Sequence, residues 1–210
     1  MQDLIILGAG VHSAEMAEIV ERVNHVRPTW NLLGYIVPHS EPSETIRNGY
    51  PVLGPPAALA EYPQAGLIAD NEWPKSLSIP RARLIALIDP ATFVSRTAAI
   101  GRGCVLYPYC FVGLNARIGE DVFCLSGSSI NHDVVLEDRV VLASGVSLAG
   151  SVHVEADCYL GQACAVRQYL RIGRGSLIGM GAVIVKDVAP NSVIAGNPGR
   201  LLRTREVTGP

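Results

Sequence analysis

The sequence predicts a two-part protein, a small α/β region of strand–helix–strand type followed by a parallel β-helix, on three observations. A Leu, Ile, Val or Cys recurs at every sixth position from Val94 to Ile184. A glycine turn near the N-terminus lies between an apolar run and a helix-like pattern. Ten of the 14 prolines lie in residues 1–90, whereas 15 of the 21 glycines and all five cysteines follow residue 100. This change in composition indicates a domain boundary near residues 80–92.

The first region has the pattern of a Rossmann-like βαβ unit. The apolar run at residues 3–7 predicts a strand, and apolar residues spaced from Ala14 to Val23 predict a helix. The segment between them, Gly8-Ala9-Gly10-Val11-His12-Ser13, predicts the turn. Further strands are predicted at 31–37 and 66–69, with a helix-like segment at 56–61. A strand, a glycine turn, a helix and a second strand are typical of a parallel α/β sheet.

The second region carries a six-residue repeat, which neither a helix of period 3.6 nor a hairpin sheet of period two explains. Sixteen positions six residues apart are all Leu, Ile, Val or Cys, and the position four residues after each is nearly always small or β-branched. Both positions must point inward. Sixteen hexads at three strands per coil give a little over five coils of short flat strands, with glycine expected where a corner needs unusual backbone angles.

Composition excludes several classes of function. The chain is 49% hydrophobic and 17% charged with a net charge of −2, so it is expected to fold and has no basic block for nucleic acid. It has no stretch of about 20 apolar residues that would span a bilayer. The N-terminus lacks the basic start and cleavage site of a secretory signal, so a cytoplasmic location is expected.

The cysteines are expected to be structural. Cys104, Cys110, Cys158 and Cys164 occupy the small inward position and Cys124 the aliphatic one, so each is expected to be a small buried side chain. A zinc site of three imidazoles is not expected either, because only two histidines fall in the repeat region. No metal is predicted.

The candidate catalytic group is His132. It follows the inward Ile130 by two residues and is therefore expected to project outward near a corner. Its neighbour Asp133 could orient the imidazole and stabilise its protonated form, as a histidine general base requires. His153 is flanked by valines and is expected to be structural or on the surface. By register alone, His132 could also be an ordinary surface histidine.

Several motifs together resemble the sugar O- and N-acetyltransferases of the sialic acid O-acetyltransferase and nucleotide-linked 4-aminosugar N-acetyltransferase type. The resemblance covers roughly residues 3–203. It rests on the glycine turn at 8–13, Ile68-Ala69-Asp70-Asn71, Leu87-Ile88-Asp89-Pro90, Asn131-His132-Asp133, Leu148-Ala149-Gly150-Ser151-Val152 and Ala195-Gly196-Asn197-Pro198-Gly199-Arg200. The order of these motifs carries the resemblance. It implies that the β-helix is left-handed.

The resemblance also implies the donor, acetyl-CoA, and the groups around it. His132 would take the proton of the acceptor, Asp133 would hold the imidazole, and the backbone N–H of Gly150 would stabilise the oxyanion. The donor would lie between neighbouring prisms of a homotrimer. The residues expected to contact it are Ala149, Gly150, Gly161, Gly179, Ala182, Lys186, Pro198 and Arg200.

For the acceptor, the resemblance implies a sugar or nucleotide sugar bound by the first region. The glycine turn would receive its phosphate or sugar, with Gly8, Ala9, Gly10, His12 and Asn71 as the contacts. We therefore expect a Rossmann-like acceptor domain in residues 1–80, a linker in 81–93, and a β-helix domain with a C-terminal tail in 94–210.

Four positions depart from the family pattern. The acidic pair usual after the second strand is Val37-Pro38, and the arginine usual after the third strand is replaced near Pro74, beside Lys75. A second family histidine is Val141 and a family asparagine is Leu125.

Three functions follow from these observations. The first is acetyl transfer to the amine of a nucleotide-linked amino sugar. The second is O-acetylation of sialic acid or another sugar. The third, of a different class, is a non-catalytic β-helix binding or assembly protein, against which the His132-Asp133 and Gly150 positions argue.

Overall fold

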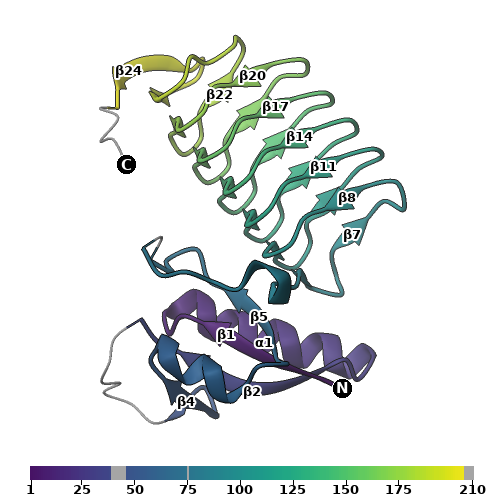
Figure 1. Cartoon of the computed structure of the whole chain (residues 1–210). Coiled ribbons are helices and arrows are strands. Elements are labelled where there is room, and N and C mark those ends of the chain that lie inside the picture. Colours follow the sequence, from purple (N-terminus) through teal and green to yellow (C-terminus); the bar gives the residue numbers. More distant parts are fainter. Residues whose placement is uncertain (39–45, 75, 206–210) are drawn as a thin grey trace. The chain divides into compact units, whose positions relative to one another are not determined.

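The computed structural model describes residues 1–38, 46–74 and 76–205 and shows two compact units, Met1–Pro90 and Ala91–Pro210 (Figure 1). The predicted linker, residues 81–93, contains the 3-10 helix η2 (Arg81–Arg83), β6 (Leu87–Ile88) and β7 (Phe93–Val94). Its first part is tied into the first unit. Arg83 donates to the carbonyl of Ala65 at 2.8 Å, and the buried carboxylate of Asp89 accepts from Arg22 at 2.6 Å.

The first unit is built on a five-stranded sheet in the order β3-β4-β2-β1-β5. The strands are β1 (Gln2–Leu7), β2 (Trp30–Ile36), β3 (Ile46–Arg47), β4 (Tyr50–Gly54) and β5 (Gly66–Ala69). β1 pairs in parallel with β2 and β5, which confirms the predicted parallel unit. The β3–β4 hairpin was not predicted. It extends the sheet because β4 adds in parallel to β2.

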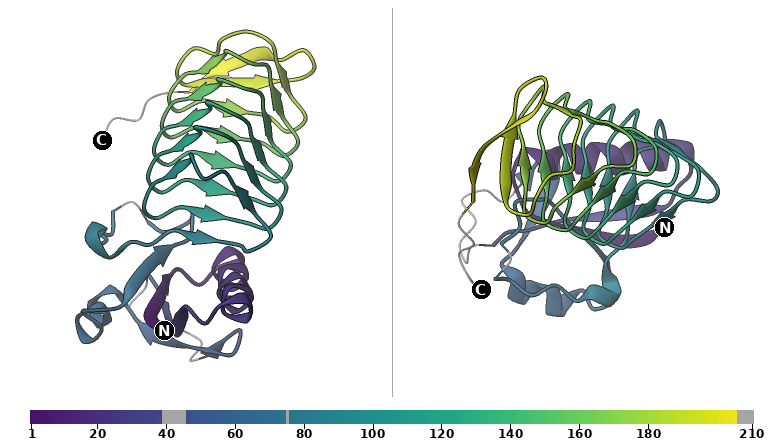
Figure 2. Two further views of the ribbon diagram at one scale, coloured as in Figure 1. Left: turned by 90° about the vertical axis from the view of Figure 1, so that its right-hand side faces the viewer. Right: turned by 90° about the horizontal axis from the view of Figure 1, so that it is seen from above.

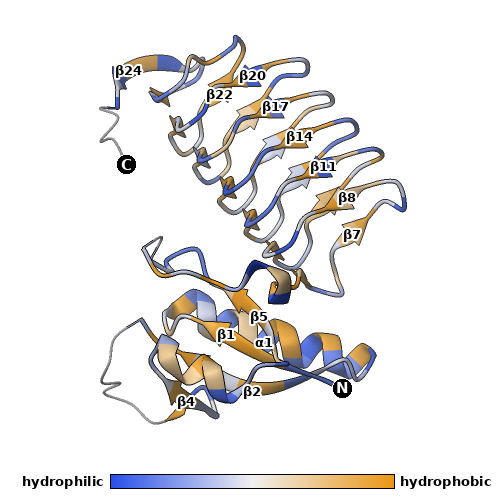
Figure 3. Ribbon diagram, viewed as in Figure 1, coloured by the Kyte–Doolittle hydropathy of each residue, from blue (hydrophilic) through white to orange (hydrophobic). Residues whose placement is uncertain are grey.

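One helix and a 3-10 turn accompany this sheet. The helix α1 (Val11–Val26) begins after Gly10 and buries Met16, Ala17, Ile19 and Val20, as its apolar spacing predicts. The segment predicted to be helix-like is the 3-10 helix η1 (Pro56–Glu61). Figure 3 shows the apolar colouring of β1, four of whose residues are fully buried.

The second unit is a stack of coils made of sixteen two-residue strands, one for each predicted hexad (Figure 2). Up to β22, neighbouring strands of one face pair in parallel and lie 18 residues apart in the chain, so three hexads make one coil. After β7 the strands are β8 (Ala99–Ile100), β9 (Val105–Leu106), β10 (Phe111–Val112), β11 (Arg117–Ile118), β12 (Phe123–Cys124), β13 (Ser129–Ile130), β14 (Val135–Leu136), β15 (Val141–Leu142), β16 (Ser147–Leu148), β17 (His153–Val154), β18 (Tyr159–Leu160), β19 (Ala165–Val166), β20 (Arg171–Ile172), β21 (Leu177–Ile178) and β22 (Val183–Ile184).

These strands form three faces. The first face has the order β22-β19-β16-β13-β10-β7 and the second β20-β17-β14-β11-β8. On the third, the order β23-β21-β18-β15-β12-β9 includes β23 (Ser192–Ala195). The strand β24 (Arg200–Thr204) pairs antiparallel with β23 and was not predicted. We refer to the line of corners between the first and second faces as the first edge.

The interior of the coils confirms the predicted register. From Leu106 onward every aliphatic repeat position is buried, and from Cys104 onward so is every small position. All five cysteines are free and buried. Burial raises the pKa of the Cys104 and Cys164 thiols to about 12 and that of Cys158 to about 11, so they are poor nucleophiles.

The corners differ from the prediction in one respect. Glycine takes the left-handed conformation at several corners, but non-glycine residues take it at others, including Asn115 at φ 57° and Asp133 at φ 59°. Asn and Asp tolerate this conformation better than most residues. Most of these corner residues also donate their N–H to the preceding coil, as Asp133 does to the carbonyl of Leu114 at 2.8 Å. Corners therefore need a coil-to-coil hydrogen bond more than they need glycine.

Within the described ranges, the structure contains no helix long and apolar enough to cross a membrane.

Candidate active site

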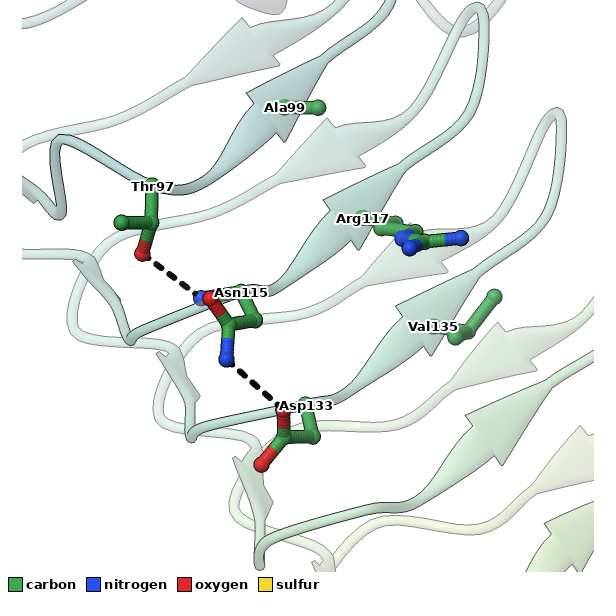
Figure 4. Close-up of a pocket in the computed structure, with 6 residues that line it drawn as sticks. All are labelled: Thr97, Ala99, Asn115, Arg117, Asp133 and Val135. Carbon is green, nitrogen blue, oxygen red and sulfur yellow. Dashed lines mark hydrogen bonds between the residues drawn. The ribbon is translucent and has the colours of Figure 1, made fainter.

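The central feature of the first edge is a hydrogen-bonded imidazole and carboxylate. Nδ1 of His132 lies 2.8 Å from Oδ2 of Asp133, and Nδ2 of Asn115 donates to the other carboxylate oxygen at 3.1 Å. Thr97 extends the row by accepting from the N–H of Asn115 at 2.9 Å (Figure 4). Thr97, Asn115 and Asp133 lie 18 residues apart, at the same corner of successive coils. Both oxygens of Asp133 are therefore fixed by the coils around them.

The carboxylate is ionised and decides which imidazole nitrogen carries the proton. Its hydrogen bond with His132, and then that with Asn115, lower the pKa of Asp133 below its ordinary value. An ionised carboxylate can only accept, so Nδ1 of His132 is the donor. Nε2 has no hydrogen-bond partner among the described residues and is therefore free to accept a proton.

Gly150 lies against the imidazole from the next coil. A Cβ atom at Gly150 would come within 2.4 Å of both Cε1 and Nε2 of His132. Its φ is outside the left-handed region, so the contact with His132 explains the glycine better than the backbone does. Its N–H has no hydrogen-bond partner in the described part of the chain, whereas its carbonyl accepts from Tyr169 at 3.2 Å. A free N–H beside a general base is the arrangement that an oxyanion site requires.

The backbone of this corner is held by the following coil. Ser151 donates its N–H to the carbonyl of His132 at 2.9 Å. The side-chain amide of Asn131 donates to the carbonyl of Leu148 at 2.6 Å. The side chain of His132 is 60% exposed, so a rigid backbone holds an accessible ring. The predicted outward position of His132 is confirmed.

A hollow of about 580 Å³ opens beside the carboxylate, on the side away from Gly150. The residues that line it are Thr97, Ala99, Asn115, Arg117, Asp133 and Val135. Figure 4 shows two parallel rows, the polar row of Thr97, Asn115 and Asp133 at the corner and the row of Ala99, Arg117 and Val135 on β8, β11 and β14. Sequence reasoning missed Asn115 and Arg117. The 18-residue spacing from Asp133 and Val135 is the signal that could have found them.

A second imidazole–carboxylate pair lies on the second face. Nε2 of His153 is 2.8 Å from Oε1 of Glu137, a partner that its sequence neighbours did not indicate. The other oxygen of Glu137 accepts from the N–H of Ala156 at 3.1 Å and lies 3.7 Å from Arg174. This pair belongs to a network that ties coils together, which agrees with the structural role predicted for His153.

The residues predicted to contact the donor fall on different parts of the β-helix. Gly161 and Gly179 lie at corners between the third and first faces, where a Cβ atom would approach backbone or side-chain atoms of the next coil at 2.7 and 3.2 Å. Their lack of a side chain thus lets successive coils stack. Ala182 is fully buried inside the prism, so its methyl group cannot contact a cofactor bound outside.

The remaining predicted donor contacts are accessible. Lys186 is exposed at the first edge, in line with His132 and Gly150 and two coils beyond Gly150. Pro198 and Arg200 are exposed around the turn that joins β23 and β24. Ala149 is half-buried and donates its N–H to the carbonyl of Val166 at 3.0 Å.

In the first unit, the glycine turn is packed against carboxylates. The N–H of Gly8 donates to the carbonyl of Ile36 at 2.8 Å, so it is not available to a phosphate. A Cβ atom at Gly8 would overlap Asp70, whose carboxylate accepts from the hydroxyl of Ser13, and one at Gly10 would lie 3.1 Å from Glu72. Burial raises the pKa of Asp70. These carboxylates argue against phosphate binding at the turn.

The other residues predicted to contact the acceptor lie in the glycine turn, at the start of α1 and directly after β5. His12 lies in the first turn of α1, with Nδ1 3.2 Å from Oε2 of Glu15. Ala9 is half-buried, and Asn71 is exposed directly after Asp70.

The structure also shows where most of the residues lie that depart from the family pattern. Val37 is buried, while Pro38 and Pro74 are half-buried, and Lys75 lies outside the described residues. Val141 lies on the third face, the face that does not border the first edge, so within one chain it cannot substitute for a group beside His132. Among the described residues, no three His, Cys, Asp or Glu side chains are grouped to hold a metal ion.

Comparison with known sequences gives a partial match. No family model matches the chain. A segment of 85 residues, or 40% of this chain, is 38% identical to the acyl-[acyl-carrier-protein]–UDP-N-acetylglucosamine O-acyltransferase of Paracoccus denitrificans. The match spans only about a third of the length of that relative, 33%.

Comparison with solved structures covers nearly the whole chain. The acetyltransferase domain of PglB from Neisseria gonorrhoeae matches with a TM-score of 0.80 and 25% identity over 96% of this chain and all of that one. Its complex with acetyl coenzyme A matches with a TM-score of 0.81, 25% identity and coverage of 96% and 99%. PerB from Caulobacter crescentus, in complex with CoA and GDP-perosamine, matches with a TM-score of 0.80 over 96% of this chain and 97% of PerB. Its identity of 21% supports the fold alone. The predicted fold class and the resemblance to the sugar acetyltransferases are both confirmed.

Proposed function

We propose that this chain transfers the acetyl group of acetyl-CoA to the amine of a nucleotide-linked amino sugar. The observation that carries the proposal is the first edge, where a hydrogen-bonded His132–Asp133 pair lies against the free N–H of Gly150. Support for the donor comes from the PglB acetyltransferase domain, which forms a complex with acetyl coenzyme A, while PerB, which is similar in fold, forms a complex with CoA and GDP-perosamine.

The reaction is a direct attack on the thioester. The acceptor nitrogen forms a bond to the acetyl carbon while Nε2 of His132 takes its proton. Asp133 stabilises the resulting imidazolium through Nδ1, and the N–H of Gly150 stabilises the charge on the acetyl oxygen. When the tetrahedral intermediate collapses, the carbon–sulfur bond breaks and the imidazolium returns a proton to the leaving CoA sulfur.

The donor groove is proposed to form between copies of this chain. His132 and Gly150 lie on the first edge, whereas Gly161 and Gly179 lie on the edge between the third and first faces. A cyclic trimer would place one edge of each copy against a different edge of the next and close a composite groove. In that groove, Ala149 and the two glycines would line the donor arm, while Lys186, Pro198 and Arg200 would lie toward its phosphates.

The first unit is proposed to receive the acceptor near Ala9, Gly10, His12 and Asn71. Because Val37 and Pro38 stand where the family has an acidic pair, O-acetylation of a sialic acid is the second candidate function. We place the reaction in the cytoplasm, since the five free cysteines suit a reducing compartment.

The test combines binding with turnover. The thermal midpoint of the wild-type protein is measured with and without acetyl-CoA, which needs no knowledge of the acceptor because a ligand of the native state raises the midpoint. Release of CoA is then measured with GDP-perosamine, UDP-linked 4-amino sugars and sialic acid. A rise in midpoint together with amine-dependent CoA release supports the proposal, and turnover of sialic acid alone would select the second candidate. No rise at millimolar acetyl-CoA would contradict both.

A further inference from the structure

Arg117 is an exposed cation on the second face that borders the hollow. It projects from β11 between Ala99 and Val135, which carry no charge, and its side chain borders the hollow beside Asp133 (Figure 4). Within residues 1–38, 46–74 and 76–205 it has no hydrogen-bond or ion-pair partner. By contrast, Arg139 pairs with Asp157 at 2.8 Å, and Arg171 pairs with Glu155. Arg139 and Arg171 thus tie coils together, whereas Arg117 ties none and borders the hollow instead.

Among the described residues, no ion pair joins Arg117 to the carboxylate that borders the same hollow. Asp133 and Arg117 line the same space, yet the oxygens of Asp133 are bound by His132 and Asn115. The planar guanidinium therefore keeps its donors for a ligand, and two parallel N–H groups suit a phosphate or a carboxylate.

The position of the hollow fits an acceptor better than a donor. Gly150 lies one coil after His132, and Asn115 and Arg117 lie one coil before Asp133 and Val135. Coils are about 4.8 Å apart, so Arg117 is within the length of a sugar and its substituent from the imidazole. A donor thioester beside Gly150 and an acceptor that extends from the hollow past Asp133 to Nε2 would meet at His132.

We propose that the hollow is a subsite for one anionic group of the acceptor, a phosphate or a carboxylate, and that Arg117 binds this group. This inference rests on the proposed function. It assigns anion recognition to a cation of the β-helix, whereas the side chains that approach Gly8 and Gly10 at the glycine turn of the first unit include the carboxylates of Asp70 and Glu72. Ala99 and Val135 would contact apolar parts of the same acceptor.

The test is the affinity of three probes for CoA-saturated protein, measured by titration calorimetry. UDP-N-acetylglucosamine offers a diphosphate, N-acetylneuraminic acid offers a carboxylate, and N-acetylglucosamine carries no charge. Each is titrated into the wild type, Arg117→Gln and the control Arg102→Gln, which removes the same charge from an exposed position at another corner. Acetyl-CoA is added to the same samples in a thermal scan.

We expect one anionic probe to lose about tenfold to 100-fold in affinity in Arg117→Gln and less than about twofold in Arg102→Gln, because a hydrogen bond to a charged group is lost. The probe that responds identifies the source of the anion, and the neutral sugar should not distinguish the variants. If acetyl-CoA raises the midpoint but no anionic probe binds more weakly to Arg117→Gln than to wild type, the subsite is wrong and the proposed function stands. If acetyl-CoA has no effect, the proposed function fails and the inference fails with it.

Discussion

The β-helix contains two imidazole–carboxylate pairs with the same separation and different surroundings. At the first edge, Nδ1 of His132 lies 2.8 Å from Oδ2 of Asp133. On the second face, Nε2 of His153 lies 2.8 Å from Oε1 of Glu137. The His132 side chain is 60% exposed and that of His153 is 34% exposed. A hydrogen-bonded histidine alone therefore does not identify an active site.

The two pairs differ in the contacts of the other carboxylate oxygen and in the surroundings of the imidazole ring. Glu137 also binds the N–H of Ala156, so it serves the stacking of coils. Asp133 binds only side chains of the corner, and the ring it orients lies against the free N–H of Gly150. Catalysis needs an open nitrogen and an available donor together, and the first edge supplies both.

Gly150→Ala should produce a large loss of activity by displacing the ring of His132, and it should leave the His153–Glu137 pair unchanged. The new Cβ atom would displace the imidazole, since it would lie 2.4 Å from Nε2. We expect a roughly 10²- to 10³-fold loss in kcat/KM, because misplacing a catalytic group or an oxyanion donor costs this much. The thermal midpoint should stay within about 2 °C of wild type, since the backbone accepts alanine here. Full activity would show that the close contact has no role in the reaction.

Asp133→Asn tests the carboxylate of the first pair. The amide leaves the ring without a charged partner, and we expect a loss of roughly tenfold to 100-fold in kcat with little change in the KM for acetyl-CoA. The measurement is steady-state CoA release. An equal loss in binding of acetyl-CoA would instead indicate that the carboxylate shapes the donor groove.

Asn115→Ala should have a smaller effect on the same pair. Removing the amide leaves one oxygen of Asp133 without its partner, so the pKa of this carboxyl should rise toward its ordinary value. A carboxyl with a lowered pKa contributes stability above its unfolded pKa and loses it as the pH falls through the folded value. In the variant this contribution should be smaller, and its loss should be complete at a higher pH. Carboxyl titration followed by NMR checks the shift, and an unchanged titration would exclude a role for Asn115.

Glu137→Gln should spare activity and affect only the second pair. Loss of the charged contacts to His153, Ala156 and Arg174 should cost about 1 kcal/mol, or roughly 2–4 °C in thermal midpoint. Turnover should stay within about twofold of wild type. If activity falls as much as in Asp133→Asn, the distinction between the two pairs is wrong.

Much of the β-helix could be predicted because its repeat is local. Each inward aliphatic residue is set by a period of six, so sixteen strands and the outward position of His132 followed from spacing alone. Contacts between coils could not be predicted as easily. They join residues 16 to 18 positions apart, which is why Asn115 and Glu137 were missed as partners of Asp133 and His153.

The first unit shows a different limit. Its parallel strands and α1 follow from apolar patterning and a glycine turn, but the chemistry at that turn depends on Asp70, which lies more than 50 residues later. The sequence suggested a phosphate site because backbone N–H groups gather at a helix start. The carboxylates that oppose an anion there are brought in by β5 and the segment after it.

The most direct test of the central claim compares His132→Asn with His153→Asn in acetyl transfer, at saturating acetyl-CoA and with the acceptor that supports the highest wild-type rate. A general base contributes about 10²- to 10⁴-fold, so His132→Asn should lose at least 100-fold in kcat while His153→Asn keeps kcat within about twofold. Both variants should still be stabilised by acetyl-CoA. Equal rates in the two variants would contradict the assignment of His132 as the catalytic base.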